Sequence, residues 1–342
     1  MKNEKKKTTI YDIANELDIT ASTVSRALND NPNVSSSTKK LVVETARKMN
    51  YQANSIAAAL RKGKSNTIGV IVPSMDRNFF ASVVRGIEDV VNDSGYNIII
   101  CQSNDSVEKE KANISTLLEA QVDGIIASYA KETTDFEHYR EIKERNVPLI
   151  LFDRVNDGLG VGSVVIDDYL GAYKATEHLI EQGCKRIVHF SGPGNVSIYK
   201  ERRRGYEEAL QAHEISVDKN LIIQSNLFLE DGYEMAKQLL ELDELPDGIF
   251  SASDFSAVGA MEIFKREGLA IPEQVAIVGF SNEQFTSFVD PSLTTVDQHS
   301  NQMGIYAARL FLDCLDDKIS TSTPPKTVLN PELIIRGSSM KK

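Results

Sequence analysis

The sequence predicts an N-terminal all-α helix-turn-helix headpiece followed by an α/β body of two doubly wound subdomains built on parallel sheets. Three observations predict this fold class. Two short amphipathic helices joined by a tight turn occupy residues 9–28. From residue 66 onward, short apolar runs alternate with helical stretches. The charge also changes sign: residues 1–65 hold 12 Lys and Arg against 6 Asp and Glu, and the remainder holds 26 against 43.

The headpiece begins with a helix over residues 9–17, where Thr9 and Asp12 form the start of a capping box. Residues 18–20 turn the chain, and Thr20 is positioned to cap a second helix over residues 21–28. Apolar residues at helical spacing pack the two helices together: Ile13, Leu17, Val24 and Leu28.

The other face of the second helix is polar and has no bulky side chain to prevent close approach to DNA. It carries Ser22, Thr23, Ser25, Arg26 and Asn29, all of which can form hydrogen bonds. A helix that enters the major groove needs such a face. The alternative is a small helical hairpin on the surface of a larger protein.

A third helix, roughly residues 37–50, is expected to close a three-helix core with Leu41, Val42, Ala46 and Met49. Residues 54–65 then combine small residues, the apolar Leu60 and three cations. This segment is too short to persist as a helix alone and suits a minor-groove wedge. The alternative is an ordinary basic linker.

The chain resembles the lactose/galactose repressor (LacI/GalR) family of bacterial transcription regulators. The resemblance rests on residues 9–14 (TIYDIA), 22–29 (STVSRALN), 34–35 (VS), 50–51 (NY) and the segment 54–60, and it extends to about residue 337. It implies sequence-specific binding to a palindromic operator by a homodimer, most simply as a repressor. The residues expected at the DNA are Thr9, Tyr11, Ala21, Ser22, Thr23, Ser25, Arg26, Asn29, Ser35, Tyr51, Asn54, Ala57, Leu60 and Arg61.

In the body, strand-like runs and helical stretches alternate up to residue 278. Strands are expected at 68–72, 97–100, 124–127, 149–152, 163–166, 186–190, 221–223, 248–250 and 275–278. Helices are expected at 79–92, 107–120, 135–145, 170–181, 199–212, 232–242 and 255–266. The resemblance implies a body similar to periplasmic sugar-binding proteins of the first type, with three crossings between the subdomains.

Ligands of open α/β sheets bind beyond the carboxyl ends of the strands. Polar residues follow four predicted strands there: Asp153-Arg154, Asp167-Asp168, Ser253-Asp254 and Ser281-Asn282. Capping of the next helix is an equal explanation for Asp167, Asp168 and Asp254. Asp153 and Arg154 lead into a glycine-containing loop instead, which favours a ligand contact.

The resemblance adds effector residues to this set. Its Arg-x-x-Gly-Phe/Tyr motif falls on Arg202, although three consecutive arginines would ordinarily form a solvated helix face. It also implies Phe79, Phe80, Leu227 (or Phe228), Ser253 and Gln298, beside Asp153, Arg154, Asp254 and Ser281. Many relatives have an Asp where this chain has Ser281. Without that carboxylate an anionic ligand meets less repulsion, so sugar phosphates and sugar acids are expected effectors beside neutral sugars.

The remaining features exclude other classes. The three cysteines have no metal-ligand spacing, so no bound metal is expected. The sequence has no phosphate loop, dinucleotide loop or nucleophile elbow, so we expect neither a cofactor nor an enzymatic activity. A secreted solute-binding protein would need a signal peptide and no headpiece. We therefore expect a cytoplasmic regulator without membrane contact: a basic disordered tail (1–7), a headpiece (8–53), a hinge (54–65) and an effector-binding, dimerising body (66–340). With no heptad repeat at the end of the sequence, a dimer is the expected assembly.

Overall fold

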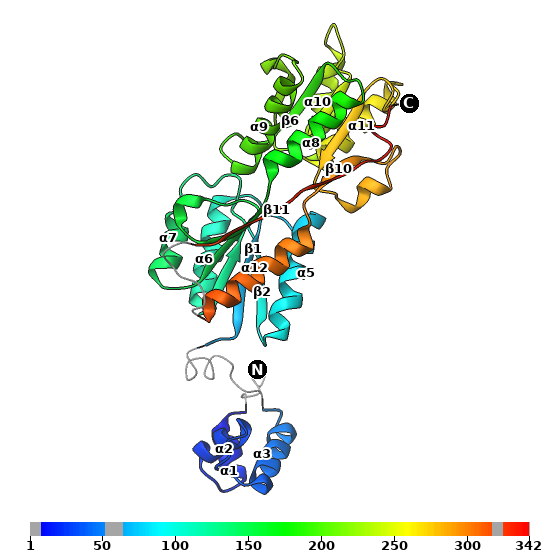
Figure 1. The fold of residues 1–342 in the computed structure, drawn as a ribbon. Helices are drawn as coiled ribbons and strands as arrows, with labels where there is room; N and C mark the ends of the chain where they lie inside the picture. Colours follow the sequence, from blue (N-terminus) through cyan, green and yellow to red (C-terminus); the bar gives the residue numbers. More distant parts are fainter. Residues whose placement is uncertain (1–7, 52–63, 317–323, 342) are drawn as a thin grey trace, which may run out of the picture. The chain divides into compact units, whose positions relative to one another are not determined.

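The computed structural model describes residues 8–51, 64–316 and 324–341. The chain divides into two compact units, residues 1–65 and 66–342, which are drawn in Figure 1. The predicted tail at 1–7 and the four predicted hinge contacts Asn54, Ala57, Leu60 and Arg61 lie outside the described residues.

The headpiece is a three-helix unit made of α1 (Ile10–Glu16), α2 (Ala21–Leu28) and α3 (Ser36–Lys48). The backbone N–H of Thr9 donates to Asp12 at 2.7 Å, and Asp12 N–H donates back to the Thr9 hydroxyl, so the capping box is formed. Thr20 caps α2 in the same way, by accepting from the Thr23 N–H at 3.2 Å. These caps satisfy amide groups that have no partner within their helices.

The core of the headpiece contains three fully buried aliphatic side chains, Ile13, Val24 and Val42. The expectation for Leu41 was wrong, because its side chain is 51% exposed. Adjacent helical residues point about 100° apart. Since Val42 and Ala46 face the core, Leu41 faces away from it.

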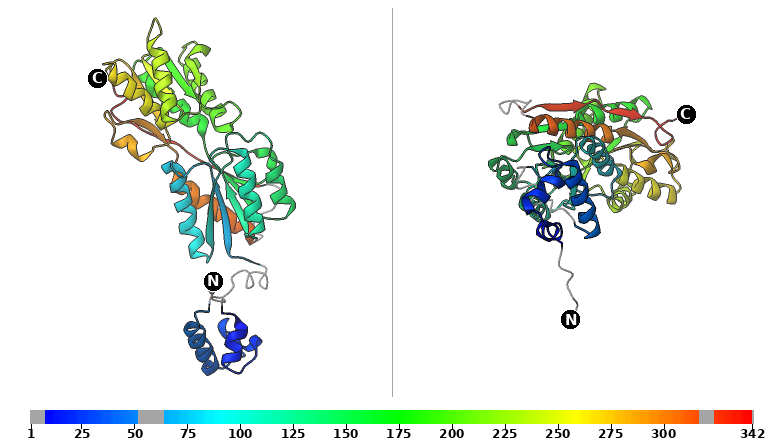
Figure 2. Two further views of the ribbon diagram at one scale, coloured as in Figure 1. Left: turned by 180° about the vertical axis from the view of Figure 1, so that it is seen from behind. Right: turned by 90° about the horizontal axis from the view of Figure 1, so that it is seen from below.

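The first subdomain of the body is a six-stranded parallel sheet in the order β11-β5-β4-β3-β1-β2. Helices α5 and α12 pack together on one face of this sheet, as the rear view in Figure 2 also shows, and α6 and α7 cover the other. Its elements are β1 (Thr67–Val72), α5 (Asn78–Asp93), β2 (Asn97–Gln102), α6 (Val107–Glu119), β3 (Gly124–Ala127), α7 (Glu137–Glu144), β4 (Leu149–Phe152), β5 (Gly162–Ile166), α12 (Ser300–Leu315) and β11 (Lys326–Leu329).

The second subdomain has six strands in the order β12-β10-β9-β8-β6-β7, of which only the β10–β12 pair is antiparallel. Helices α8 and α9 cover one face, and α10 and α11 cover the other. Its elements are α8 (Asp168–Glu181), β6 (Ile187–Ser191), α9 (Ser197–Ala212), β7 (Ile222–Gln224), α10 (Leu229–Leu240), β8 (Gly248–Ser251), α11 (Asp254–Arg266), β9 (Ala276–Phe280), the 3-10 turn η3 (Gln284–Ser287), β10 (Thr294–Asp297) and β12 (Glu332–Ile334).

The chain passes between the subdomains three times: from β5 to α8, from β10 to α12, and from β11 to β12. Each subdomain is therefore assembled from separate stretches of sequence. The predicted class, two doubly wound parallel-sheet subdomains behind a helical headpiece, is confirmed. The sequence pattern assigned no element after residue 278, and so it missed β10, α12, β11 and β12. No helix in the described part of the chain is long and apolar enough to cross a membrane.

Candidate functional site

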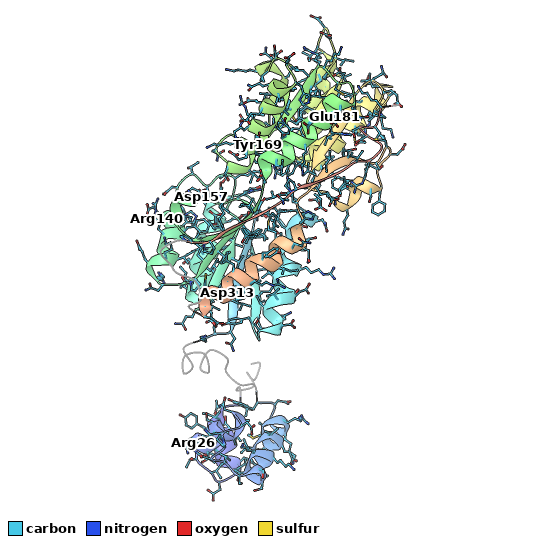
Figure 3. All side chains as sticks on the ribbon, viewed as in Figure 1. Arg26, Arg140, Asp157, Tyr169, Glu181 and Asp313 are labelled. Atoms are coloured by element: carbon cyan, nitrogen blue, oxygen red, sulfur yellow. The ribbon has the colours of Figure 1, made fainter. Side chains whose placement is uncertain are left out.

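The exposed face of α2 presents Arg26 without any intramolecular partner among the described residues. Figure 3 labels this side chain. The hydroxyls of Ser22 and Thr23 lie 2.8 and 2.9 Å from the Thr20 hydroxyl, which orients them at the start of the helix. Asn29 donates to the Ser25 carbonyl at 2.7 Å. Arg26 is thus the long, charged donor on this face that remains available for an outside acceptor.

The other described headpiece residues expected at DNA fall into three groups. Tyr11 is 68% exposed, which is unusual for an aromatic side chain in so small a unit. Thr9 and Ser35 occupy the N-caps of α1 and α3, where backbone N–H groups attract phosphates. Ala21 and Tyr51 are partly buried against the headpiece core, so much of each surface serves packing.

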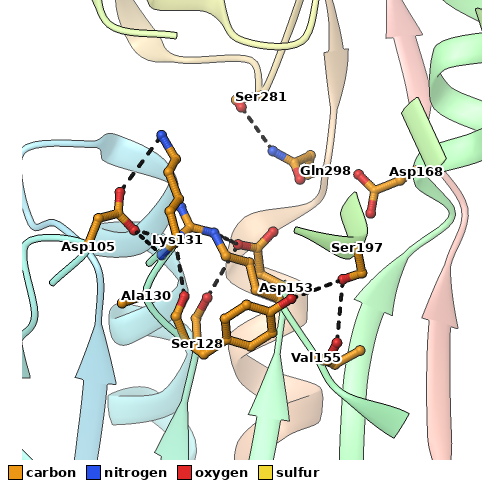
Figure 4. A network of polar contacts seen from close by, with 12 residues as sticks. Asp105, Ser128, Ala130, Lys131, Asp153, Val155, Asp168, Ser197, Ser281 and Gln298 are labelled. Atoms are coloured by element: carbon orange, nitrogen blue, oxygen red, sulfur yellow. Dashed lines mark hydrogen bonds and ion pairs between the residues drawn. The ribbon is translucent and has the colours of Figure 1, made fainter. Parts of the chain in front are cut away.

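In the body, polar side chains gather where the strands of the first sheet end, as Figure 4 shows. Arg154 is buried, forms an ion pair with Asp105 and donates to the Tyr129 carbonyl at 3.0 Å. Its Nε has no hydrogen-bond partner among the described residues. Lys131 lies 3.8 Å from the Asp105 carboxylate, so two cations share one carboxylate.

Asp153 is the least satisfied charge of this group. It is 4% exposed, yet among the described residues its carboxylate accepts only a long hydrogen bond from Ser128 (3.4 Å) and lies 3.9 Å from the Arg154 Nε. Burial raises the pKa of its carboxyl, although Arg154 opposes the shift. Its backbone is left-handed (φ 58°), a conformation that costs free energy in a non-glycine residue. A buried, strained and weakly paired carboxylate is suited to an external hydrogen-bond donor.

The second subdomain contributes Arg202, whose guanidinium is held on three sides. It donates to Asp168 at 2.8 Å, to the Ala252 carbonyl at 2.9 Å and to Gln298 at 3.3 Å, and it stacks 3.7 Å from the centre of the Phe280 ring. Arg203 and Arg204 instead form exposed ion pairs with glutamates. Of the three consecutive arginines, only Arg202 is therefore buried.

One further contact completes this wall. Gln298 donates to the Ser281 hydroxyl at 3.0 Å, so Arg202, Gln298 and Ser281 form one chain of hydrogen bonds. Burial raises the pKa of Asp168 to about 7, and the neighbouring Arg202 limits that rise. Near neutral pH, the charge on Asp168 depends on the presence of its arginine.

Other predicted effector residues have different surroundings. Phe79 and Phe80 are buried at the start of α5 with ring centres 5.0 Å apart. Leu227 points into the hydrophobic core and is fully buried. Of the two candidates Leu227 and Phe228, the exposed Phe228 is therefore the one that can reach the cleft between the subdomains. The left-handed backbone of Leu227 (φ 62°) turns its side chain inward.

The residues that precede helices resolve into different roles. The Asp167 carboxylate caps α8 by accepting from the Leu170 N–H at 2.8 Å. Asp254 is fully buried and accepts from the Glu283 N–H (2.8 Å) and the Thr295 hydroxyl (2.6 Å), so its carboxylate is occupied within the second subdomain. Ser253 is the N-cap residue of α11, is buried, and makes no side-chain cap bond.

A cavity of about 320 Å³ lies between the two subdomains beside their crossing segments. Asp153 and Asp168 line it, together with Tyr169, Ser197 and Glu201. Asp153 is the only one of the ten predicted effector residues on its wall, because the other side of the cleft is filled by contacts between the subdomains. A larger open groove of about 590 Å³, beside β7 and α10, contains none of these residues.

Asp105, Lys131 and Tyr129 were not predicted from the sequence, although the strand-end rule that predicts Asp153 applies to them. Asp105 follows β2, and Tyr129 and Lys131 follow β3, at the same carboxyl edge of the sheet. Glu283 follows β9 in the same way and was not predicted either, whereas Arg77 carries no such signal because it directly precedes a helix. Among the described residues, no three or more His, Cys, Asp or Glu side chains are grouped so that they could hold a metal ion.

Comparison with known proteins accounts for both units. Residues 9–54 match the model of bacterial regulatory proteins of the lacI family, and residues 65–329 match that of periplasmic binding proteins and the sugar-binding domain of the LacI family. The ribose operon repressor of Halalkalibacterium halodurans is 34% identical over 312 residues, which cover 91% of each chain.

Two solved structures resemble the chain closely. A LacI family transcriptional regulator of Enterococcus faecium with bound ribose is 26% identical, has a TM-score of 0.71, and covers 80% of this chain and 98% of its own. The lac repressor dimer bound to operator and the anti-inducer ONPF has a TM-score of 0.86 at 24% identity, over 98% of this chain and 100% of its own, and so supports the fold.

Proposed function

The chain belongs to the LacI family of bacterial transcriptional regulators, and on that premise we propose that its headpiece reads an operator whose occupancy is set by a small effector bound in the cleft of the body. It is a DNA-binding repressor of this family and not an enzyme. The observation that carries the DNA-binding role is the unpaired, exposed Arg26 on the polar face of α2. A cytoplasmic location follows from its DNA target.

Arg26 is the proposed base-reading residue. Ala21 and Ser22 are too short for two-point base contacts, whereas a guanidinium can donate twice to a guanine. Tyr11, Thr9, Ser35 and the N-terminal turn of α2 would then position the helix on the phosphates. Asn54, Ala57, Leu60 and Arg61 stay proposed minor-groove contacts, with Leu60 as the side chain that inserts between base pairs.

The test compares Arg26→Ala with wild type on operator and on random DNA. We expect a loss of about 1–3 kcal/mol on the operator and relaxed preference at one base pair per half-site. Lys40→Ala, an exposed cation on α3, is the control and should weaken both DNAs alike. Equal weakening of both DNAs by Arg26→Ala would reduce its role to a phosphate contact.

The effector site is proposed around Asp153, with Phe79, Phe80, Ser281, Gln298 and Arg202 on the surrounding walls. Its cations already have carboxylate partners: Arg202 pairs with Asp168, and Arg154 and Lys131 share Asp105. An anionic ligand would have to displace one of these carboxylates, whereas sugar hydroxyls can donate to Asp153 without doing so. This balance favours a neutral, hydroxyl-rich effector over the sugar phosphates and sugar acids that Ser281 alone suggested.

The effector test titrates neutral sugars, sugar phosphates and sugar acids while operator affinity is measured. We expect a neutral sugar to change that affinity, and Asp153→Asn to abolish its effect while operator binding without ligand is kept. An identical response of Asp153→Asn and wild type to the active compound would remove Asp153 from the site. A response confined to the anionic compounds would overturn the argument from charge balance.

The body is also the proposed dimerisation unit, since a palindromic operator requires two headpieces related by a twofold axis. The edge strand β2 exposes Ile99 (39%) and Ile100 (43%), and Phe288, next to η3, is 85% exposed. Large apolar side chains so exposed mark a contact surface. We propose that a second copy of the chain covers them.

A further inference from the structure

Helix α5 begins without a cap from its own subdomain. Its N-cap position is occupied by Arg77, whose side chain makes no capping hydrogen bond. A cation at this place is also unfavourable, because the N-terminus of a helix carries partial positive charge. The first turn of a 16-residue helix therefore depends on another group for its free amides.

That group comes from the opposite subdomain. The Glu283 carboxylate accepts from the Asn78 N–H at 2.9 Å and from the Phe79 N–H at 3.4 Å. Glu283 is 3% exposed, and its own N–H is fixed by Asp254. A carboxylate across a helix N-terminus satisfies both the amides and the dipole, so this contact spans the cleft with a favourable charge arrangement.

Two cations of the first subdomain, Arg77 and Lys131, also contact the second subdomain. Arg77 lies 5.6 Å from the ring centre of Phe228 and 5.3 Å from that of Phe255, both in the second subdomain. Lys131 lies 5.1 Å from Phe228 and donates to the Asn226 carbonyl at 2.7 Å. Phe228 is thus held between two cations of the opposite subdomain, an arrangement with favourable cation–π energy.

We propose that Glu283 is a latch that keeps the cleft closed in the absence of effector, by capping α5 from across the cleft with Arg77 and Lys131 on Phe228 as its support. This inference rests on the proposed effector cleft and assigns its resting state. Opening the cleft removes the cap from α5, whose first turn carries Phe79 and Phe80. A ligand that favours either conformation must therefore work with or against the Glu283 contact.

The test measures the separation of the subdomains in full-length protein without ligand. Spin labels are attached at Glu119→Cys (α6) and Lys237→Cys (α10), both exposed positions, and the distance between the labels is measured. The native cysteines Cys101, Cys184 and Cys314 are replaced first. The labelled protein is diluted into excess unlabelled protein. We expect a single short distance for the starting chain. Glu283→Gln, nearly identical in shape, should move the closed-to-open ratio about tenfold toward a longer distance, the size of a lost charged cap.

Two further variants make the outcome decisive. Glu283→Asp keeps the charge but shortens the side chain, so it should open the cleft as Glu283→Gln does. Asp218→Asn removes a carboxylate that caps the 3-10 turn at Lys219–Leu221 within its own subdomain (2.9 Å to the Asn220 N–H) and should leave the distance unchanged. Hydrogen exchange of residues 78–80 should rise in both Glu283 variants.

Faster exchange with an unchanged distance would reduce Glu283 to a local cap and overturn the latch. An unchanged distance and unchanged exchange would overturn it as well. Operator binding and the effector titration are separate measurements, so failure of the latch is distinguishable from failure of the proposed function.

Discussion

Removal of the Arg202 guanidinium should destabilise the body, and the loss should depend on pH. Arg202→Met replaces the guanidinium that stacks on Phe280 with an apolar group and leaves Asp168, which is 6% exposed, without its cation. Breaking a buried ion pair costs about 3–5 kcal/mol when the remaining charge stays buried. If the remaining carboxyl is protonated, the loss falls to about 1–3 kcal/mol, the cost of an unsatisfied polar group.

The pH range follows from the pKa of Asp168, about 7 in the folded chain against an ordinary value of 3.8. Between these values the folded state holds a proton that the unfolded state has released. Stability therefore falls as pH rises through this range and becomes level above it. Without Arg202 the folded pKa rises further, so the variant continues to lose stability between about pH 7 and about pH 8 while the wild type does not.

Urea unfolding followed by far-UV circular dichroism at about pH 6 and about pH 8 measures this difference. Asp254, whose pKa burial also raises to about 7, is present in both proteins and cancels in the comparison. Arg203→Met, which removes an exposed ion pair from the same helix, should cost less than about 1 kcal/mol at either pH. An equal loss for Arg202→Met at both pH values would refute the reasoning, and so would failure of Arg202→Met/Asp168→Leu to recover stability at the higher pH.

The remaining predictions concern assembly and packing. Ile100→Asp and Phe288→Asp should each shift the dimer toward monomer in sedimentation equilibrium. Val328 is 52% exposed on the opposite edge strand β11, and Val328→Asp should leave the dimer unchanged. A dimer unaffected by the first two variants would place the interface elsewhere. Gly304→Ala should lower the unfolding free energy by about 2 kcal/mol or more, because a Cβ there overlaps the Val83 carbonyl oxygen. Gly194→Ala, where a Cβ meets only the flexible side chain of Gln224, is the control, and similar losses for both would contradict the close-packing argument.

The sequence predicted most of the elements but not the direction of every side chain. Its strand–helix alternation placed the strand ends that carry Asp153, Asp168 and Ser281, since that rule depends only on local pattern and parallel topology. Leu227 and Phe228 could not be distinguished in this way. Leu227 has a left-handed backbone (φ 62°), which changes the direction of its side chain. A leucine in the sequence gives no indication of such a conformation.

The sequence contains a second indication that Arg202 is buried, which the prediction did not use. A Cβ at Gly205 would overlap the Tyr169 carbonyl oxygen, so α9 approaches the backbone of α8 at this residue. Residues three apart share a helix face, so Arg202 lies on the buried face with Gly205. Arg204 lies at the exposed edge of the contact, with its guanidinium 4.0 Å from the ring centre of Tyr169 in α8. The pattern Gly205-Tyr206-Ala209 marks this buried face in the sequence, independently of any family resemblance.

The contact between α5 and α12 extends the consequence of the Glu283 contact through the first subdomain. At Gly86 and Gly304 the two helices approach backbone to backbone: a Cβ at either glycine would overlap a carbonyl oxygen of the other helix. No side chain lies between them there to absorb a displacement by changing its rotamer. Close-packed interiors transmit such a displacement instead. A shift of α5 when the cleft opens must therefore carry α12 with it, and α12 follows directly on the crossing from β10, two residues after Gln298. The cap at one end of α5 and the Arg202–Gln298 hydrogen bond are thus connected through two helices that pack backbone to backbone.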